Sequence, residues 1–296
     1  MRYQVEHQTI YRYDVPVIQS QQLLHLMPRQ TAFQQCVSYT LACEPQPAEQ
    51  SRRLDFFGNH NDYFTLLTPH QSLEVTSRFQ VDIQPRPKMA ELVQSPPWEQ
   101  VQTLLKDQDT HHLDAAPYVY ATRRVTCSEA LASFALSCFT PQRPVLEAAM
   151  ALTQKIYTEF EFDPQATDVS TPLDTVLKGR RGVCQDFAHL MIGALRSIGL
   201  ACRYVSGYIL THPPAGQPRL VGADASHAWV SVYCPVYGWV DFDPTNNCLV
   251  QQEHITVAWG RDFGDVSPMR GVVLGGGQQQ LKVSVTVTPL AYAGQA

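Results

Sequence analysis

The spacing of hydrophobic residues along this chain changes near residue 100. Before that point, short stretches alternate apolar and polar side chains, most clearly at 3–11, and a strand-like composition continues at 38–42. A period of two is typical of strands with one buried face. Gly58-Asn59 separates two further apolar stretches and predicts a hairpin. The pattern therefore predicts an N-terminal antiparallel β domain over residues 1–95.

Helical spacing appears after a proline-rich segment at 85–97. Apolar residues at positions 145, 149, 152 and 156 follow Pro144 at the period of a helix. Thr171-Pro172 predicts the start of a short helix, with the threonine as its cap. A further apolar stripe predicts a helix over 184–197, which Gly199 ends.

Strand-like stretches return after this helix, at 201–209, 227–234 and 238–243. Near the end of the chain, four apolar residues alternate strictly over 281–287, which is the pattern of a strand with one buried face. We predict an α+β fold, in which residues 96–296 form a second domain that closes with this C-terminal strand.

The composition narrows the class of protein. The chain has 296 residues, 44% hydrophobic and 17% charged, with a net charge of −5 and no long basic run. These values indicate a folded protein and argue against a nucleic-acid partner. No signal-peptide core and no apolar segment of membrane-spanning length stand out, so we expect a cytoplasmic protein without membrane contact. The eight cysteines include no Cys-x-x-Cys pair, so we expect reduced thiols, no metal and no cofactor.

Cys184 is the first candidate for chemistry, because it stands where a loop meets the apolar helix predicted over 184–197. The unpaired N–H groups and the dipole at a helix start favour negative charge, and so favour the nucleophilic thiolate. The same N–H groups can stabilise the oxyanion that forms when a carbonyl is attacked. The other seven cysteines lack this setting.

His227 is the candidate proton carrier. It opens a predicted strand, on the face that alternation shares with Trp229. His189 is a rival, but five residues along a helix turn it about 140° away from Cys184, so it points away from the thiol.

A carboxylate to orient the histidine comes from Asp241 or Asp243, which lie on the same face of the predicted strand over 238–243. Strand alternation does not choose between them. Asp243 precedes Pro244, which holds it extended at the strand end, although the following residues also have the composition of a simple turn. Cysteine, histidine and aspartate together suffice for nucleophilic acyl chemistry.

Five segments together closely resemble the bacterial transglutaminase-like superfamily. They are residues 182–190 (GVCQDFAHL), 199–208 (GLACRYVSGY), 227–229 (HAW), 238–245 (GWVDFDPT) and 260–266 (GRDFGDV). The β-rich N-terminal residues resemble the domain that accompanies this core. The resemblance implies a papain-like core with Cys184 as nucleophile, His227 as general base and acid, and Asp243, in preference to Asp241, as the orienting carboxylate.

The resemblance leaves the reaction open. It implies a cysteine-dependent hydrolase or acyl transferase that acts on a peptide, a protein or a small amide, with protein-glutamine cross-linking and a non-catalytic scaffold as alternatives. The loop before Cys184 has no Gln or Asn to serve as a papain-type oxyanion donor. The chain also lacks a calcium loop of the Asp-x-Asp-x-Asp-Gly kind, so we expect no calcium dependence. The oligomeric state is not predicted.

Overall fold

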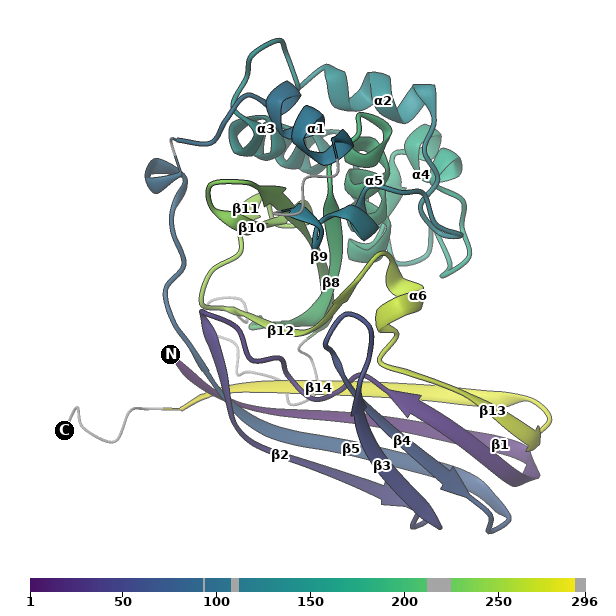
Figure 1. Cartoon of the computed structure of the whole chain (residues 1–296). Coiled ribbons are helices and arrows are strands. Elements are labelled where there is room, and N and C mark those ends of the chain that lie inside the picture. The colour runs from purple at the N-terminus through teal and green to yellow at the C-terminus, as the bar shows by residue number, and fades with distance from the viewer. Residues whose placement is uncertain (93, 108–111, 212–224, 291–296) are drawn as a thin grey trace, which may run out of the picture.

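The computed structural model describes residues 1–92, 94–107, 112–211 and 225–290. A large antiparallel sheet forms one layer, and a part that combines helices with a smaller sheet lies over it (Figure 1). The two ends of the chain meet in the large sheet, where the yellow C-terminal strands lie beside the purple N-terminal strand (Figure 1). None of the helices among the described residues is long and apolar enough to cross a membrane.

The large sheet contains seven strands, five of them in the order β2-β5-β1-β4-β3. The two C-terminal strands, β13 and β14, both pair with β1. The strand bounds are β1 Arg2–Leu24, β2 Gln34–Glu44, β3 Glu49–Leu54, β4 His60–Leu66, β5 His70–Ile83, β13 Met269–Gly275 and β14 Gln279–Leu290.

The predicted hairpin is confirmed, with shifted strand ends. Strands β3 and β4 pair from Leu54 opposite His60. Gly58 has a φ of +73° in the connecting turn, a conformation that glycine adopts without steric cost. The apolar stretches that predicted this hairpin, at 54–57 and 63–67, begin a few residues later than the strands, because Phe56 and Phe57 are apolar but lie in the turn.

The face of the large sheet that meets the upper part is apolar. Tyr3, Val5 and Phe79 are buried and belong to the same hydrophobic core as the helices of the upper part. A polar contact joins the layers as well, since Nδ1 of the buried His7 lies 2.7 Å from the hydroxyl of Tyr208. Because side chains alternate along β1, Tyr3, Val5 and His7 lie on the face that packs against the upper part, and β1 thereby connects the two layers.

The upper part contains a five-stranded antiparallel sheet in the order β11-β10-β9-β8-β12. Its strands are β8 Cys202–Ile209, β9 Ala225–Cys234, β10 Gly238–Asp243, β11 Cys248–Leu249 and β12 His254–Gly260. A parallel pair of two-residue strands, β6 Glu161–Phe162 and β7 Arg181–Gly182, lies apart from it. The helices are α1 Trp98–Lys106, α2 Glu129–Leu136, α3 Val145–Glu159, α4 Leu173–Gly179, α5 Cys184–Ser197 and α6 Phe263–Val266, with short 3-10 turns at Met89–Glu91 and Ala116–Tyr118.

Helix α5 is the central helix of the upper part and packs against β8 and β9. Its side chains are buried from Asp186 to Arg196, because the sheet lies on one side and other helices cover the rest. Gly199 follows the helix with a φ of +77°, as expected for a glycine that ends a helix. The bounds predicted for this helix are confirmed.

The predicted α+β class is confirmed, and so are the helix after Pro144 and the C-terminal strand. One detail is wrong, because α4 begins at Leu173 with Pro172 as its cap and no side chain caps it. Instead, the Thr171 hydroxyl accepts a hydrogen bond from the N–H of Asp168. The division into domains at 1–95 and 96–296 stays a prediction, and the C-terminal strand lies in the sheet of the N-terminal strands.

Candidate active site

Cys184 is the first residue of α5 and is half-buried. The turn before it is fixed by Asp186, whose carboxylate reaches back to accept a hydrogen bond from the N–H of Val183 at 2.8 Å and another from the Thr167 hydroxyl at 2.6 Å. Burial raises the pKa of Asp186, although both hydrogen bonds oppose that shift. Gly182 is required here, since a Cβ on it would lie 2.7 Å from the Asp186 carboxylate.

The start of α5 offers unpaired donors beside the thiol. The N–H of Phe187 makes the first bond of the helix, to the carbonyl of Val183 at 3.0 Å. The N–H groups of Cys184, Gln185 and Asp186 precede it, so they have no acceptor within the helix. Such groups favour negative charge on a nearby sulfur or oxygen.

The three residues proposed from the sequence come together. Nε2 of His227, on β9, lies 2.7 Å from Oδ2 of Asp243, at the end of β10. The Cys184 side chain lies close enough to the His227 ring to help raise its pKa. Because Nε2 is occupied by Asp243, Nδ1 is the ring nitrogen left for the sulfur. His227 and Asp243 are buried, with side-chain exposures of 5% and 0%.

Asp243 has several hydrogen-bond partners besides His227. The N–H groups of Thr245 and Asn246 donate to Oδ1 at 2.9 and 3.2 Å. Nδ2 of Asn246 donates to Oδ2 at 2.7 Å, and Nε2 of His254 lies 3.0 Å from the same oxygen. A carboxylate with this many donors is fixed in orientation and stays ionised despite its burial.

The charges of the pair follow from these contacts. Burial lowers the pKa of His227, but the hydrogen bonds to Asp243 and Cys184 and the charges of both partners outweigh it and raise the pKa to about 10. Burial raises the pKa of Asp243, yet the hydrogen bonds and charges of His227 and His254 hold it well below its usual range. An imidazolium next to a carboxylate is therefore the favoured state at neutral pH.

The two rival residues from the sequence lie elsewhere. His189 is buried, and its Nε2 accepts a hydrogen bond from the N–H of Phe263 at 3.1 Å. Burial lowers its pKa to about 3, so it is a neutral acceptor in the core. Asp241 pairs with Arg86, whose Nη1 lies 2.6 Å from Oδ2, and also accepts a long 3.4 Å bond from Nε1 of Trp229.

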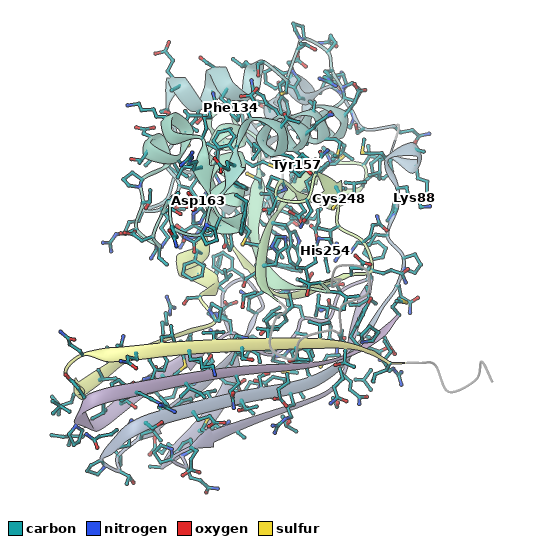
Figure 2. All side chains as sticks on the ribbon, turned by 180° about the vertical axis from the view of Figure 1, so that it is seen from behind. Lys88, Phe134, Tyr157, Asp163, Cys248 and His254 are labelled. Carbon is teal, nitrogen blue, oxygen red and sulfur yellow. The ribbon has the colours of Figure 1, made fainter. Side chains whose placement is uncertain are left out.

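Sequence reasoning missed two neighbours of the candidate triad, Asn246 and His254, and gave a third, Trp229, no role. Asn246 stands three residues after Asp243, in a stretch whose turn composition was visible but had no assigned role. His254 comes from β12 and no local pattern marks it; Figure 2 shows it on the side of the upper part that faces the large sheet. Trp229 lies edge-on to His254, with ring centroids 5.4 Å apart, and near His227 at 6.0 Å.

One group among the described residues could hold a metal ion. The possible ligand atoms of His227, Asp243 and His254 lie within 4.8 Å of one another. Both histidine nitrogens, however, lie in direct hydrogen-bond contact with the same carboxylate oxygen, at 2.7 and 3.0 Å. Those contacts satisfy the donors and the acceptor without a cation, so we interpret the group as a hydrogen-bond network.

Comparison with known proteins identifies the family. The profile of the "Bacterial transglutaminase-like N-terminal region" matches residues 3–82, and the profile of the "Transglutaminase-like superfamily" matches residues 132–244. The chain belongs to the transglutaminase-like superfamily. The second profile spans Cys184, His227 and Asp243, whereas His254 lies outside it. The predicted family is therefore confirmed.

Relatives match the chain over nearly its full length. An uncharacterized protein of Mycobacterium tuberculosis is 39% identical over 97% of this chain and 93% of its own, and one of Mycobacterium leprae is 33% identical over 98% and 99%. A protein-glutamine gamma-glutamyltransferase of Pseudomonas aeruginosa is 35% identical over 32% of this chain and 15% of its own.

Among solved structures, one from Cytophaga hutchinsonii, named a "Putative Cysteine Protease", superposes with a TM-score of 0.76. It covers 99% of this chain and 92% of that one at 20% identity. At this identity the likeness shows the fold alone, and it extends over both layers.

Proposed function

We propose that this protein is an enzyme that breaks an amide or peptide bond through a thioester on Cys184. Its substrate would be a peptide, a protein or a small amide. The observation that carries the proposal is the buried pair of His227 and Asp243, 2.7 Å apart, beside a Cys184 thiol that helps raise the pKa of His227. A thiol, an imidazole and an ionised carboxylate in this order have the chemistry of a nucleophile, a proton carrier and an orienting group.

In the first half-reaction, the Cys184 thiolate attacks the carbonyl carbon, and the carbonyl oxygen becomes an oxyanion. The unpaired N–H of Cys184 at the start of α5 is our candidate donor to that oxyanion. The C–N bond then breaks as the His227 imidazolium gives its proton to the leaving amine. The products are a free amine and a thioester, with His227 neutral.

In the second half-reaction, neutral His227 takes a proton from the acceptor as it attacks the thioester. Water gives a carboxylic acid, and an amine gives a new amide; in both cases the sulfur leaves as thiolate and His227 is again protonated. Asp243 holds the ring in one orientation throughout and stabilises its charged form. We favour hydrolysis, because water is always available and no amine-binding site is evident in the sequence.

Cross-linking is the second candidate, and the Pseudomonas relative supports it, because that protein is named as a protein-glutamine transferase. The acceptor decides between the two reactions. A peptide library would be incubated with the enzyme, with and without about 10 mM glycine ethyl ester as amine, roughly tenfold above the upper end of common KM values. The products are analysed by mass spectrometry. Hydrolysis predicts products that gain water whether or not amine is present, whereas transfer predicts products that carry the amine.

The reactivity of the thiols tests the alternative that the protein is a non-catalytic scaffold. Burial raises the pKa of Cys43, Cys202 and Cys248 to about 12, so these stay protonated and slow towards iodoacetamide at pH 6. Cys127 is the matched control, since it is exposed but stands in a loop away from the candidate triad. We expect Cys184 to react at least tenfold faster than Cys127. Equal or slower labelling of Cys184 would favour the scaffold.

A further inference from the structure

A cavity lies where the two layers of the molecule meet, apart from the candidate triad. Its volume is about 320 Å³, within the range of small-molecule sites. The lining comes from the connection between β1 and β2, from Arg86 after β5, and from strands β8, β9, β10 and β12. Neither Cys184 nor His227 lines it.

Stacked arginines and tryptophans make up one side of this cavity. The guanidinium carbon of Arg203 lies 3.6 Å from the ring centre of Trp239 and 4.7 Å from that of Trp259. Arg29 does not line the cavity, but its guanidinium carbon approaches the ring centre of Trp259 as well, at 3.5 Å. Stacking of this kind holds the planar guanidinium groups in fixed orientations.

Of the arginines around this cavity, one has a carboxylate in direct contact among the described residues. Arg86 is bound to Asp241, but Arg203 and Arg29 form no ion pair with a carboxylate of the described residues. Arg203 is only 9% exposed, and its Nε has no hydrogen-bond partner among the described residues. Burial lowers the pKa of both Arg203 and Arg29, and the charges of Asp114 and Asp241 near Arg203 and of Asp55 near Arg29 oppose that shift. Buried cations of this kind normally touch an anion, and no carboxylate of the described residues forms an ion pair with Arg203.

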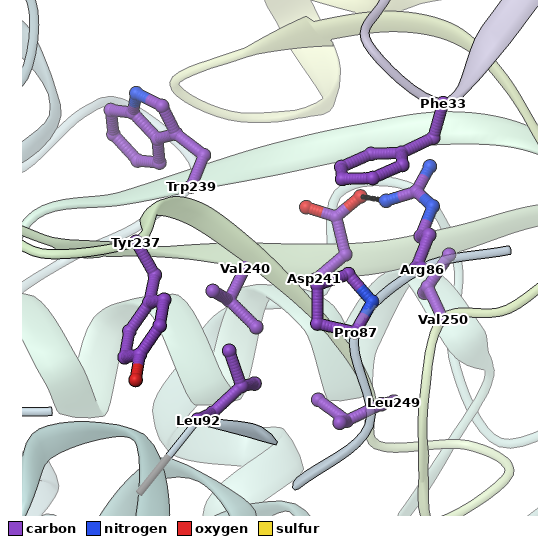
Figure 3. A pocket seen from close by; sticks show the side chains of 10 residues that line it. All are labelled: Phe33, Arg86, Pro87, Leu92, Tyr237, Trp239, Val240, Asp241, Leu249 and Val250. Atoms are coloured by element: carbon purple, nitrogen blue, oxygen red, sulfur yellow. Dashed lines mark hydrogen bonds and ion pairs between the residues drawn. The ribbon is translucent and has the colours of Figure 1, made fainter. Parts of the chain in front are cut away.

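A smaller, more apolar pocket shares part of its lining with this cavity. Figure 3 shows this smaller space, of about 70 Å³, with Arg86 and Asp241 at one end and Leu92 and Leu249 at the other. Phe33 and Trp239 line both spaces. A molecule with a negative group near Arg203 could therefore place an apolar body against these side chains.

We propose that this cavity binds a molecule that joins one carboxylate to an apolar, ring-sized body. The carboxylate accepts hydrogen bonds from the Arg203 guanidinium, and the body lies against Phe33 and Trp239. A single negative charge fits, because the lining carries two arginines and one aspartate. Guanidinium groups match the planar geometry of carboxylates. The proposal concerns binding and does not depend on the reaction proposed for Cys184.

The test uses phenylacetate as the probe and phenylacetamide, its neutral counterpart, as the control. Binding is followed by tryptophan fluorescence. We expect phenylacetate to bind at least tenfold more tightly to the wild type, and Arg203→Met to remove that preference. Arg78→Met is the matched control, because Arg78 is exposed and pairs with Glu6 on the large sheet. Equal binding of the two compounds, or a preference that survives Arg203→Met, would overturn the proposal.

A measurement on the wild type covers the case in which Arg203→Met fails to fold. Phenylacetate should shift the indole ¹⁵N–¹H signals of Trp239 and Trp259 and leave that of Trp98, which begins α1, unchanged. No shift at all, or equal shifts of all three, contradicts the site. A short peptide ending in phenylalanine, with a free or an amidated carboxyl group, then tells whether the carboxylate belongs to a peptide terminus or to a small acid. If the free-carboxyl peptide binds more tightly than the amidated one, as phenylacetate does relative to phenylacetamide, the ligand is a peptide terminus. If phenylacetate binds and neither peptide does, the ligand is a small acid.

Discussion

Nε2 of His227 lies 2.7 Å from Oδ2 of Asp243, and both side chains are buried. The neighbouring acid, Asp241, pairs with Arg86 instead, at 2.6 Å. Two aspartates one pleat apart thus have different partners: one a titratable ring, the other a guanidinium that stays charged. This difference makes the proposed roles of the two residues separable by experiment.

Cys184→Ala should abolish turnover and leave the fold intact. The substitution removes one sulfur at a helix start, so we expect the free energy of unfolding to change by about 1 kcal/mol or less. Turnover is measured on the substrates found in the peptide library, and stability by urea unfolding. Cys127→Ala, at an exposed cysteine, should keep wild-type activity. Wild-type turnover by Cys184→Ala would refute the thioester mechanism.

Asp243→Asn should slow the reaction by a factor of roughly 10² to 10⁴, because the amide no longer stabilises the imidazolium or fixes its tautomer. A loss at the lower end means that the asparagine still orients the ring, as a neutral amide does in Cys-His-Asn enzymes. Asp241→Asn should cost much less rate, because its carboxylate bonds Arg86 and Trp229 rather than His227. The comparison to make is kcat/KM of both variants at equal folded fraction. A larger loss for Asp241→Asn would reverse the assignment.

His254 is expected to act as a positioning residue through Asp243. His254→Leu removes a donor 3.0 Å from Oδ2, so the ionised carboxylate is less stabilised and less firmly held. We expect kcat to fall about tenfold, as for a lost hydrogen bond to a charged group, with KM little changed and the acidic limb of the pH–rate profile moved to higher pH.

His254→Gln retains an N–H near the same place and should recover most of the rate. His70→Leu is the control, since His70 is also largely buried but bonds the carbonyl of Thr68 in the large sheet. If both His254 variants kept the wild-type pH–rate profile, or if His254→Gln were no faster than His254→Leu, His254 would not be a positioning residue.

The sequence was sufficient to predict the features that depend on a local pattern of residues. The bounds of α5 followed from its apolar stripe and Gly199, and Cys184 followed from its place at the start of that stripe. The choice between Asp241 and Asp243 did not, because strand alternation gives them the same face. What separates them is the partner of each side chain, and Arg86 lies 155 residues from Asp241 in the chain.

Pairing between distant strands was equally hidden. Alternation over 281–287 predicted a strand, but nothing in it indicated that Val287 would lie opposite Val5. His254 reaches Asp243 only because β12 pairs with β8 across more than forty residues. Contacts of this kind depend on topology, which a single sequence does not specify locally.

The pair of His227 and Asp243 should also make stability depend on pH. The folded state raises the pKa of His227 to about 10, so this contribution is complete below the unfolded value of about 6.5 and is lost as the pH rises towards 10. The folded state lowers the pKa of Asp243, so that contribution is present above its unfolded value of about 3.9 and is lost as the pH falls through the folded value. The pair therefore contributes most between about pH 4 and 6.5.

Urea unfolding of Asp243→Asn and wild type at pH 5.5, 7.5 and 9.5 (chosen to span the His227 window of roughly 6.5 to 10) tests this dependence. We expect the variant to be less stable by about 2 kcal/mol at the lowest pH, as for a hydrogen bond to a charged group, and the difference to shrink at each step upward. Asp241→Asn is the matched control: its partner is an arginine, which does not titrate in this range, so its difference from wild type should stay constant. A constant difference for Asp243→Asn would mean that the His227 proton is held no more tightly in the folded protein than in the unfolded chain, and the imidazolium–carboxylate pair would have to be given up.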